Sequence, residues 1–213
     1  MTGERRTALT DFQVEVATLF FSLPSSDGFL LAGGAALVAQ RLTSRPTQDL
    51  DFFTASGAAA VHAARDELTA AAADRGWTVT TVRDHDTFCR LLIHGDEDLI
   101  VDMALDSSPI LPPQSSSLGP TFDAQELAGR KLIALFDRAA ARDFVDVYLL
   151  SRRYSTRTLL LRAQEVDAGF DHRVLADMLG LLDRYSDVDL NLGDVDVLAL
   201  RDFFRQWRTD LQS

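Results

Sequence analysis

Two carboxylates, Asp49 and Asp51, lie close together on a short predicted strand. Side chains two residues apart on a strand point to the same face, so these acids share one face while Leu50 and Phe52 occupy the other. Like charges this close resist joint ionisation unless a cation lies between them, and Mg²⁺ and Mn²⁺ favour carboxylate oxygens. The spacing therefore predicts a divalent metal site, with Mg²⁺ or Mn²⁺ as the cofactor.

A glycine pair and a third acid accompany this strand. Gly33 and Gly34 follow the apolar stretch 29–32 and open a helical pattern, so their amides are expected at a positive helix end that binds phosphate. Asp102 interrupts the apolar strand 99–104, where a lone carboxylate is costly without a partner. Alone, the glycines are typical of a turn and paired acids of a solvated strand end. The order of all three features indicates a metal and phosphate site.

An α/β (α+β) core with a mixed sheet is expected to position these residues, with an α-helical C-terminal region behind it. A turn at 95–98 predicts a hairpin that brings Asp102 beside Asp49 and Asp51. The segment 106–120, rich in proline and serine, is expected to form a linker or flexible rim. The predicted domains are 1–110 and 121–213. The predicted strands are 27–31, 48–53, 77–83, 87–94 and 98–105, and the predicted helices are 10–23, 34–42, 57–75, 124–138, 142–153, 156–167, 172–185 and 194–211.

Lys131 is the only lysine in a chain that has twenty arginines. On a helix it shares a stripe with Leu127 and Leu135, so its amine is expected to point inward. A buried ammonium needs an anionic partner, which a phosphate or a carboxylate supplies. The alternative is a lysine at a helix rim that extends its amine to solvent. Asp143 and Asp146, three residues apart, lie on one helical face further along.

Composition indicates a water-soluble protein. The chain has 213 residues, 46% of them apolar, and lacks the run of about eighteen uncharged apolar residues that a membrane span requires. Asp11 and Glu15 interrupt the first apolar segment, which disfavours a signal peptide. Cys89, the single cysteine, lies among apolar residues and is expected to pack in the core. We expect a cytoplasmic protein without a membrane partner.

Charge bears on the choice of substrate. The net charge of −11 repels a phosphate backbone. The segment 129–162, however, holds eight basic and three acidic residues, a net of +5. Its arginines either form a nucleic-acid surface, with Arg152, Arg153 and Arg157 as the candidate RNA-binding residues, or pair within helices on a solvated face.

Three motifs together resemble the AbiEii/AbiGii family of toxin nucleotidyltransferases, which belongs to the DNA polymerase beta-like superfamily. They are 31–37 (LAGGAAL), 45–53 (RPTQDLDFF) and 142–148 (RDFVDVY). The match covers about residues 27–150, and the joint order is more specific than any single motif. The resemblance implies a functional lysine on the helix after the core, here Lys131. It also implies that the Asp-x-x-Asp motif, Asp143 and Asp146, contributes a general base or an orienting carboxylate. We favour Asp143 over Asp146 for that role.

The resulting expectation is a nucleotidyltransferase that moves a nucleoside monophosphate from an NTP to an acceptor hydroxyl. Two Mg²⁺ ions would be held by Asp49 and Asp51, and Asp102 would join the metal that activates the acceptor. The phosphates would be bound by Gly33, Gly34 and Lys131. By resemblance alone, the acceptor would be tRNA, the role a growth-inhibiting toxin, and the partner a separately encoded antitoxin.

One position departs from the pattern, because nucleotidyltransferases usually have Ser or Thr where this chain has Ala35. Thr47, two residues before Asp49, is expected to supply a hydroxyl for nucleotide binding instead, or to be a site where modification blocks the metal. Two alternative functions remain. One is a nucleotidyltransferase that acts on small molecules such as antibiotics, and the other is an inactive nucleotide-binding module.

Overall fold

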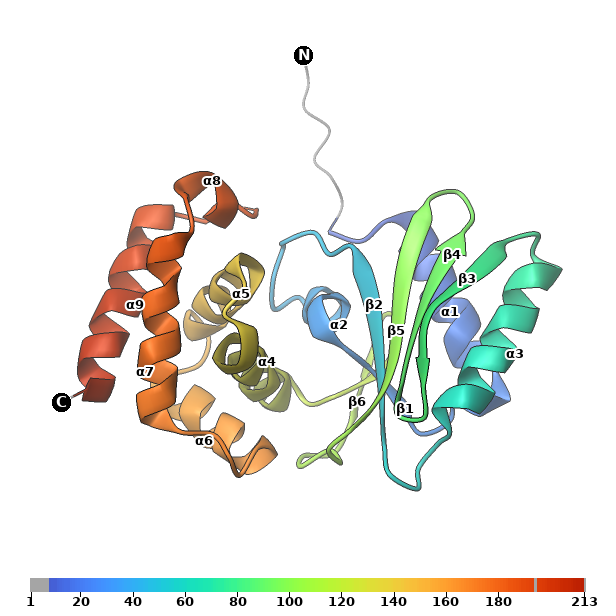
Figure 1. The fold of residues 1–213 in the computed structure, drawn as a ribbon, viewed down its shortest axis with the longest axis horizontal. Coiled ribbons are helices and arrows are strands. Elements are labelled where there is room, and N and C mark those ends of the chain that lie inside the picture. The colour runs from blue at the N-terminus through green and yellow to red at the C-terminus, as the bar shows by residue number, and fades with distance from the viewer. Residues whose placement is uncertain (1–7, 194, 213) are drawn as a thin grey trace, which may run out of the picture. The chain divides into compact units, whose positions relative to one another are not determined.

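The computed structural model describes residues 8–193 and 195–212, which fold into two compact units (Figure 1). The first unit holds the described residues up to Gln40 together with Pro46–Asp123. The second holds Arg41–Arg45 and the chain from Ala124 onward, so five residues between two elements of the first unit belong to the second. The predicted domains, 1–110 and 121–213, stay a prediction.

A mixed seven-stranded sheet forms the first unit, as the sequence predicted, in the order β3-β4-β5-β2-β1-β7-β6. Neighbours β2 and β5 run parallel, as do β1 and β7, and the other neighbouring pairs are antiparallel. The strands are β1 (Phe29–Ala32), β2 (Asp49–Ala55), β3 (Thr78–His85), β4 (Phe88–His94), β5 (Asp98–Asp106), β6 (Gln114–Ser116) and β7 (Gly119–Thr121).

Helices cover the two faces of this sheet unequally. Helices α1 (Asp11–Ser22) and α3 (Val61–Asp74) lie on one face, and the short α2 (Gly33–Ala39) lies on the other (Figure 1). The face under α1 and α3 is aromatic, because Phe20 of α1 stacks on Phe52 of β2 with ring centroids 4.0 Å apart. Alternation along β2 therefore turns its two aspartates, Asp49 and Asp51, toward the face that carries α2.

The segment 106–120 departs from expectation, and its description as a linker or rim is wrong for residues 114–120. Strand β7 contains Pro120 and lies between β1 and β6. It pairs with β1 at Leu31 and Thr121, and the Thr121 hydroxyl donates a hydrogen bond of 2.9 Å to the Leu31 carbonyl. Because the strand is only three residues long, the amide that proline lacks removes little from the ladder.

Helices build the second unit, as predicted. Its core includes an edge-to-face pair of Phe144 and Phe204, whose ring centroids lie 5.1 Å apart. The predicted helix 172–185 ends at Gly180 and continues as a 3₁₀ turn, Leu181–Arg184, and the predicted start at Asp194 lies outside the described residues. The α-helices are α4 (Ala124–Arg138), α5 (Ala141–Ser151), α6 (Thr156–Val166), α7 (His172–Gly180), α8 (Asp187–Leu190) and α9 (Val197–Gln212).

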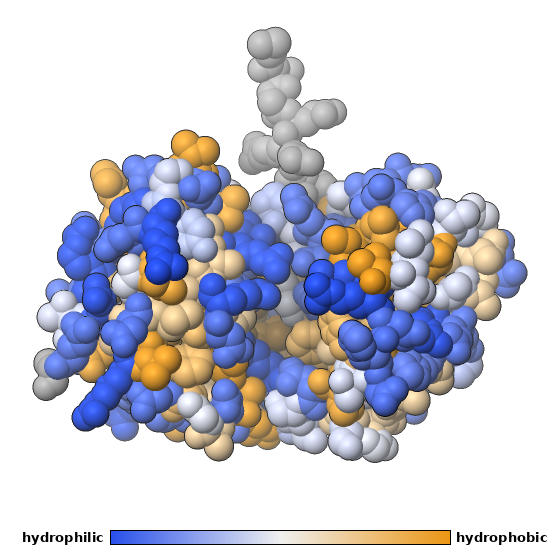
Figure 2. Space-filling view, viewed as in Figure 1, coloured by the Kyte–Doolittle hydropathy of each residue, from blue (hydrophilic) through white to orange (hydrophobic). Residues whose placement is uncertain are grey.

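The surface of both units is mainly hydrophilic on the face that Figure 2 shows, and hydrophobic side chains there form small, separate patches. Fully buried aromatic side chains lie inside each unit, such as Phe20 and Phe52 in the first and Phe144 and Phe204 in the second. Among the described helices, none combines the length and apolarity needed to cross a membrane.

Candidate active site

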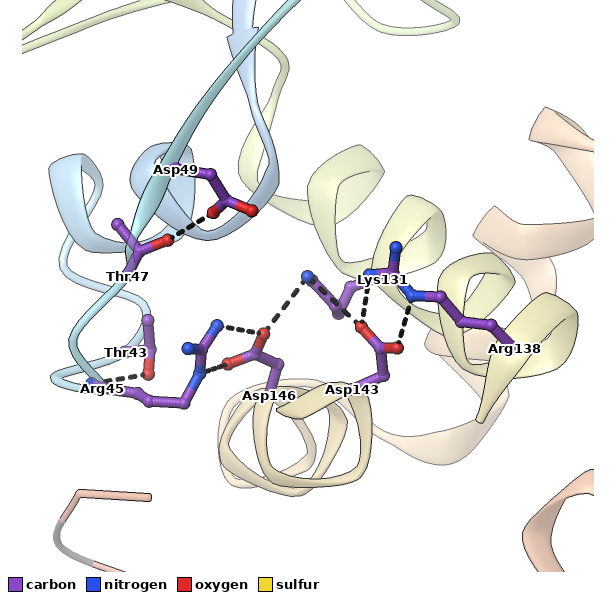
Figure 3. A network of polar contacts seen from close by, with 8 residues as sticks. All are labelled: Thr43, Arg45, Thr47, Asp49, Lys131, Arg138, Asp143 and Asp146. Carbon is purple, nitrogen blue, oxygen red and sulfur yellow. Dashed lines mark hydrogen bonds and ion pairs between the residues drawn. The ribbon is translucent and has the colours of Figure 1, made fainter. Parts of the chain in front are cut away.

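Asp49 and Asp51 occupy one face of β2, as the spacing predicted. Both are half-buried, whereas Leu50 and Phe52 between and after them are fully buried on the other face. The Thr47 hydroxyl donates a 2.9 Å hydrogen bond to Oδ1 of Asp49 (Figure 3). This bond fixes the orientation of the first carboxylate, which is how partners of metal ligands commonly act.

Gly33 meets the second carboxylate directly. Its φ of +61° lies in the left-handed region, and a Cβ at this position would stand 1.7 Å from Oδ2 of Asp51. Only glycine therefore allows the chain to turn from β1 into α2 while the Asp51 carboxylate keeps its place. Gly34 and Ala35 follow, both buried in the first turn of α2. The glycine pair and the acid pair thus form one local structure, and Ala35, which follows them, is fully buried.

Asp102 also lies on this face, because the parallel ladder places it directly opposite Asp51. Its two carboxylate oxygens accept hydrogen bonds from Arg90 on the neighbouring strand β4, at 2.7 Å from Nε and 2.6 Å from Nη2. Arg90 had no role in the sequence analysis. Hydrogen bonding to Asp102 raises the pKa of the guanidinium; burial opposes this, and the charges of Asp102, Asp49 and Asp51 add to it.

The second unit holds a buried ionic network around Lys131 (Figure 3). The Lys131 side chain is 8% exposed, and its Nζ lies 3.2 Å from Oδ2 of Asp146 and 3.7 Å from Oδ1 of Asp143. Leu127 and Leu135, the neighbours on its stripe, are buried as well. The inward orientation is therefore confirmed, and the alternative of an amine that extends to solvent is wrong.

Each of the two acids has an arginine of its own. Asp146 accepts two hydrogen bonds from Arg45, of 2.8 Å and 2.9 Å, and Asp143 accepts two from Arg138, also of 2.8 Å and 2.9 Å. Burial acts to raise the pKa of Asp143, but the hydrogen bonds from Arg138 and the nearby Lys131 charge outweigh it and lower that pKa. A carboxylate stabilised in this way accepts a proton poorly. The geometry accordingly supports an orienting role for Asp143 rather than a role as general base.

Six of the seven arginines in the basic segment 129–162 fall into two groups. Arg130, Arg138 and Arg162 pair with acidic residues of their own unit. Arg152, Arg153 and Arg157, by contrast, are exposed at the end of α5 and the start of α6. The pairing expected for a solvated face thus accounts for part of the basic segment, and three exposed arginines remain as candidates.

Cys89 lies in the core of the sheet with no exposed surface, as expected. Burial raises the pKa of its thiol to about 11, so at neutral pH the side chain is an uncharged thiol with little nucleophilic character.

Arg45 and Arg90 are the residues that sequence reasoning left without a role. Arg45 was quoted only as part of a motif, although an arginine so close to an acid pair suggests a carboxylate partner. Arg90 had a detectable signal, because counting pairs outward from the predicted turn at 95–98 places it opposite Asp102.

Comparison with solved structures identifies the fold as that of nucleotidyltransferases. The chain resembles MenT4, a nucleotidyltransferase toxin of Mycobacterium tuberculosis, with a TM-score of 0.61 and 18% identity over 95% of this chain and 82% of that one. JHP933 of Helicobacter pylori gives a TM-score of 0.59 and 17% identity, covering 93% and 90% of the two chains. A putative nucleotidyltransferase of the same organism gives 0.58 and 19%, covering 93% and 92%.

The family follows from the sequence itself. The model of the nucleotidyl transferase AbiEii toxin family, which belongs to type IV toxin–antitoxin systems, matches residues 19–213. The chain therefore belongs to the AbiEii family and is a nucleotidyltransferase, as the motifs predicted. No curated protein sequence matches it.

Proposed function

We propose that this protein transfers a nucleoside monophosphate from an NTP to a hydroxyl of tRNA, with release of pyrophosphate, and that it acts as a toxin countered by a cognate antitoxin. The observation that carries the proposal is the close contact of Gly33 with Asp51, which makes the glycine turn and the acid pair one local structure. Family membership supports the reaction class and the antitoxin. We place the reaction in the cytoplasm, where NTPs and tRNA are available.

Asp49 and Asp51 are the residues we assign to a divalent metal, Mg²⁺ or Mn²⁺. They are hard oxygen donors on one strand face, half-exposed, and the Thr47 hydroxyl orients the first of them. The metal, when bound, supplies charge that neutralises the triphosphate and stabilises an in-line displacement. Asp102, which the sequence predicts as a further ligand, accepts two hydrogen bonds from Arg90.

Each unit supplies its own candidates for binding the nucleotide phosphates. Gly33 and Gly34 offer backbone amides at the start of α2, and Lys131 offers a compact charge. An ammonium has three donors, and Asp143 and Asp146 are the two acids beside it. In our proposal these carboxylates orient the amine, and its remaining donor contacts a phosphate oxygen.

The acceptor assignment depends on the exposed arginines of the second unit. A three-arginine variant, in which Arg152, Arg153 and Arg157 are all replaced by alanine, removes these charges without touching the buried network. If tRNA binds there, the salt dependence of binding should fall by roughly one in slope for each phosphate contact that the variant removes.

The decisive experiment incubates the protein with each labelled NTP, Mg²⁺ and total tRNA, and it compares wild type with Asp49→Asn/Asp51→Asn. We expect label on tRNA from wild type and none from the double variant. Label on a small hydroxylated metabolite instead of RNA would favour the small-molecule enzyme, which the net charge of −11 also favours. NTP binding without any transfer would favour an inactive binding module.

A further inference from the structure

We propose that Gln13 is a positioning residue of the active site, because it holds Thr47 in the place from which the Thr47 hydroxyl orients the Asp49 carboxylate. Gln13 lies on α1, and all three residues belong to the first unit. This inference rests on the proposed function, since it concerns one of the two acids to which a divalent metal is assigned there.

The buried side chain of Gln13 makes hydrogen bonds in two directions. Its Oε1 accepts a 2.9 Å bond from the N–H of Thr10, and the Thr10 hydroxyl accepts a 3.1 Å bond from the N–H of Gln13. Together these two bonds form the capping box at the start of α1. The amide nitrogen of Gln13, Nε2, donates a 3.1 Å bond to the Thr47 carbonyl, 34 residues further along the chain. The side-chain oxygen therefore caps the helix, and the side-chain nitrogen binds the segment before β2.

Thr47 is held through both polar groups of its backbone by the N-terminal part of the chain. Its N–H donates a 3.3 Å bond to the Ala8 carbonyl, and its carbonyl accepts from Gln13. Residues 43–47 have no regular secondary structure, so the position of Thr47 depends on contacts of this kind. The Thr47 hydroxyl then donates to Oδ1 of Asp49 (Figure 3). Contacts through Thr47 thus connect the Gln13 amide to an acid of β2.

The packing and capping of α1 do not by themselves explain a glutamine at this position. Phe12, Val16 and Phe20 supply buried apolar surface on the same helix. A capping box needs only a side-chain oxygen, which glutamate offers as well as glutamine does. Gln13 is 2% exposed, and a buried amide is costly unless its polar atoms are hydrogen-bonded. The bond from Nε2 to the Thr47 carbonyl is therefore the contact that distinguishes glutamine here.

Gln13→Glu separates the two contacts of this side chain. Glutamate still offers an oxygen to the Thr10 N–H, but its ionised form has no donor for the Thr47 carbonyl. Mn²⁺, titrated alone by calorimetry at pH 7.5, should bind this variant about tenfold more weakly than wild type. That is the low end of the roughly 10- to 100-fold that loss of a ligand's hydrogen-bond partner costs, since Gln13 acts through Thr47. Gln13→Met, which has no donor at any pH, should show the same loss and replaces Gln13→Glu if that variant does not fold.

Thr10→Ala is the matched control, because it removes the hydroxyl of the capping box and leaves the Gln13 amide in place. It should lower the Tm by roughly 2–4 °C, the effect of a lost cap, and keep the Mn²⁺ affinity of wild type. Thr47→Val removes the hydroxyl that orients Asp49 and should weaken Mn²⁺ binding at least as much as Gln13→Glu does. In Gln13→Glu/Thr47→Val the two losses should not add, because both variants interrupt the same contacts.

The possible results of these titrations are distinct. Wild-type Mn²⁺ affinity in the Gln13 variants would overturn the inference, and so would an equal loss of affinity in Thr10→Ala, because α1 would then act through stability alone. Additive losses in the double variant would show that Gln13 and Thr47 act independently, which also overturns it. Asp49→Asn tests the proposed function separately, since unchanged Mn²⁺ binding in that variant would overturn the metal site itself.

Discussion

Gly33→Ala is the single substitution that most directly tests whether the glycine turn and the acid pair form one site. A methyl group at this position would stand 1.7 Å from Oδ2 of Asp51, whereas ordinary contacts begin near 3.4 Å. The carboxylate must therefore move by roughly 1.7 Å to make room. Metal–oxygen distances tolerate only about 0.2 Å, so the displaced Asp51 can no longer act as a ligand where it now lies.

The size of the expected effect follows from mass action. At a metal concentration of about 100 times Kd, binding stabilises the folded protein by about 2.7 kcal/mol. For a chain of this length, each kcal/mol corresponds to roughly 2–4 °C in Tm, so wild type should gain about 5–10 °C when Mn²⁺ is added. Gly33→Ala should lose most of this gain. It should also lose about 1–2 kcal/mol without metal, because alanine is strained at a φ of +61°.

Gly57→Ala is the matched control. Gly57 has a φ of +79°, but an added Cβ there would meet nothing within 4 Å. This variant should therefore show the same strain of about 1–2 kcal/mol while keeping the full metal-induced shift. The measurement is thermal unfolding with and without Mn²⁺, together with urea unfolding for the strain. A Gly33→Ala protein that keeps the wild-type Mn²⁺ shift would refute the geometric link between the turn and Asp51.

Three further results are expected. Lys131→Ala should weaken NTP binding in a direct binding assay, and Lys131→Arg should restore it only in part. The alanine variant should also lose stability, toward the lower end of the roughly 3–5 kcal/mol that is typical of broken buried ion pairs, because arginines still neutralise Asp143 and Asp146. Asp143 has a lowered pKa in the folded state, so the stability it contributes is complete above its unfolded pKa of about 3.9 and is lost as pH falls through the folded value. Urea unfolding from pH 6 to 3 should therefore show that the difference in free energy of unfolding between wild type and Asp143→Asn narrows on acidification. A constant difference would contradict the network. The three-arginine variant should keep metal and NTP binding but lose label transfer to tRNA, and equal transfer by wild type and variant would show that these arginines form a solvated face.

The sequence alone predicted the position of a side chain wherever a local rule, such as strand alternation or helical periodicity, determines that position. Strand alternation put Asp49 and Asp51 on one face, and the hairpin turn at 95–98 paired Asp102 with Arg90. Helical periodicity turned Lys131 inward between two leucines. Each of these positions depends on the spacing of residues close together in the chain, which can be read directly from their order.

Strands β6 and β7 could not be predicted in the same way. Their sequence is rich in serine and proline and carries no alternation, and the strand β7 exists because the Thr121 hydroxyl and backbone find partners on Leu31, ninety residues earlier. Propensity is a weak guide to a short strand that depends on such a distant contact. Arg45 is a similar case, since its partner Asp146 lies 101 residues away.

The two arginine–carboxylate pairs show what residue type alone does not predict about acidic residues in such a chain. A carboxylate on a strand or helix of a nucleotidyltransferase invites assignment to a metal, but the carboxylates of Asp102 and Asp146 are buried and accept bidentate hydrogen bonds from Arg90 and Arg45. Each pair satisfies a buried charge that would otherwise be strongly destabilising. Asp49 and Asp51 differ from these two acids in their access to solvent, because both are half-exposed; the Thr47 hydroxyl donates to Asp49, and Gly33 lies close to Asp51. A hydrated cation can therefore reach the half-exposed acid pair of β2 more readily than it can reach the buried carboxylates of Asp102 and Asp146.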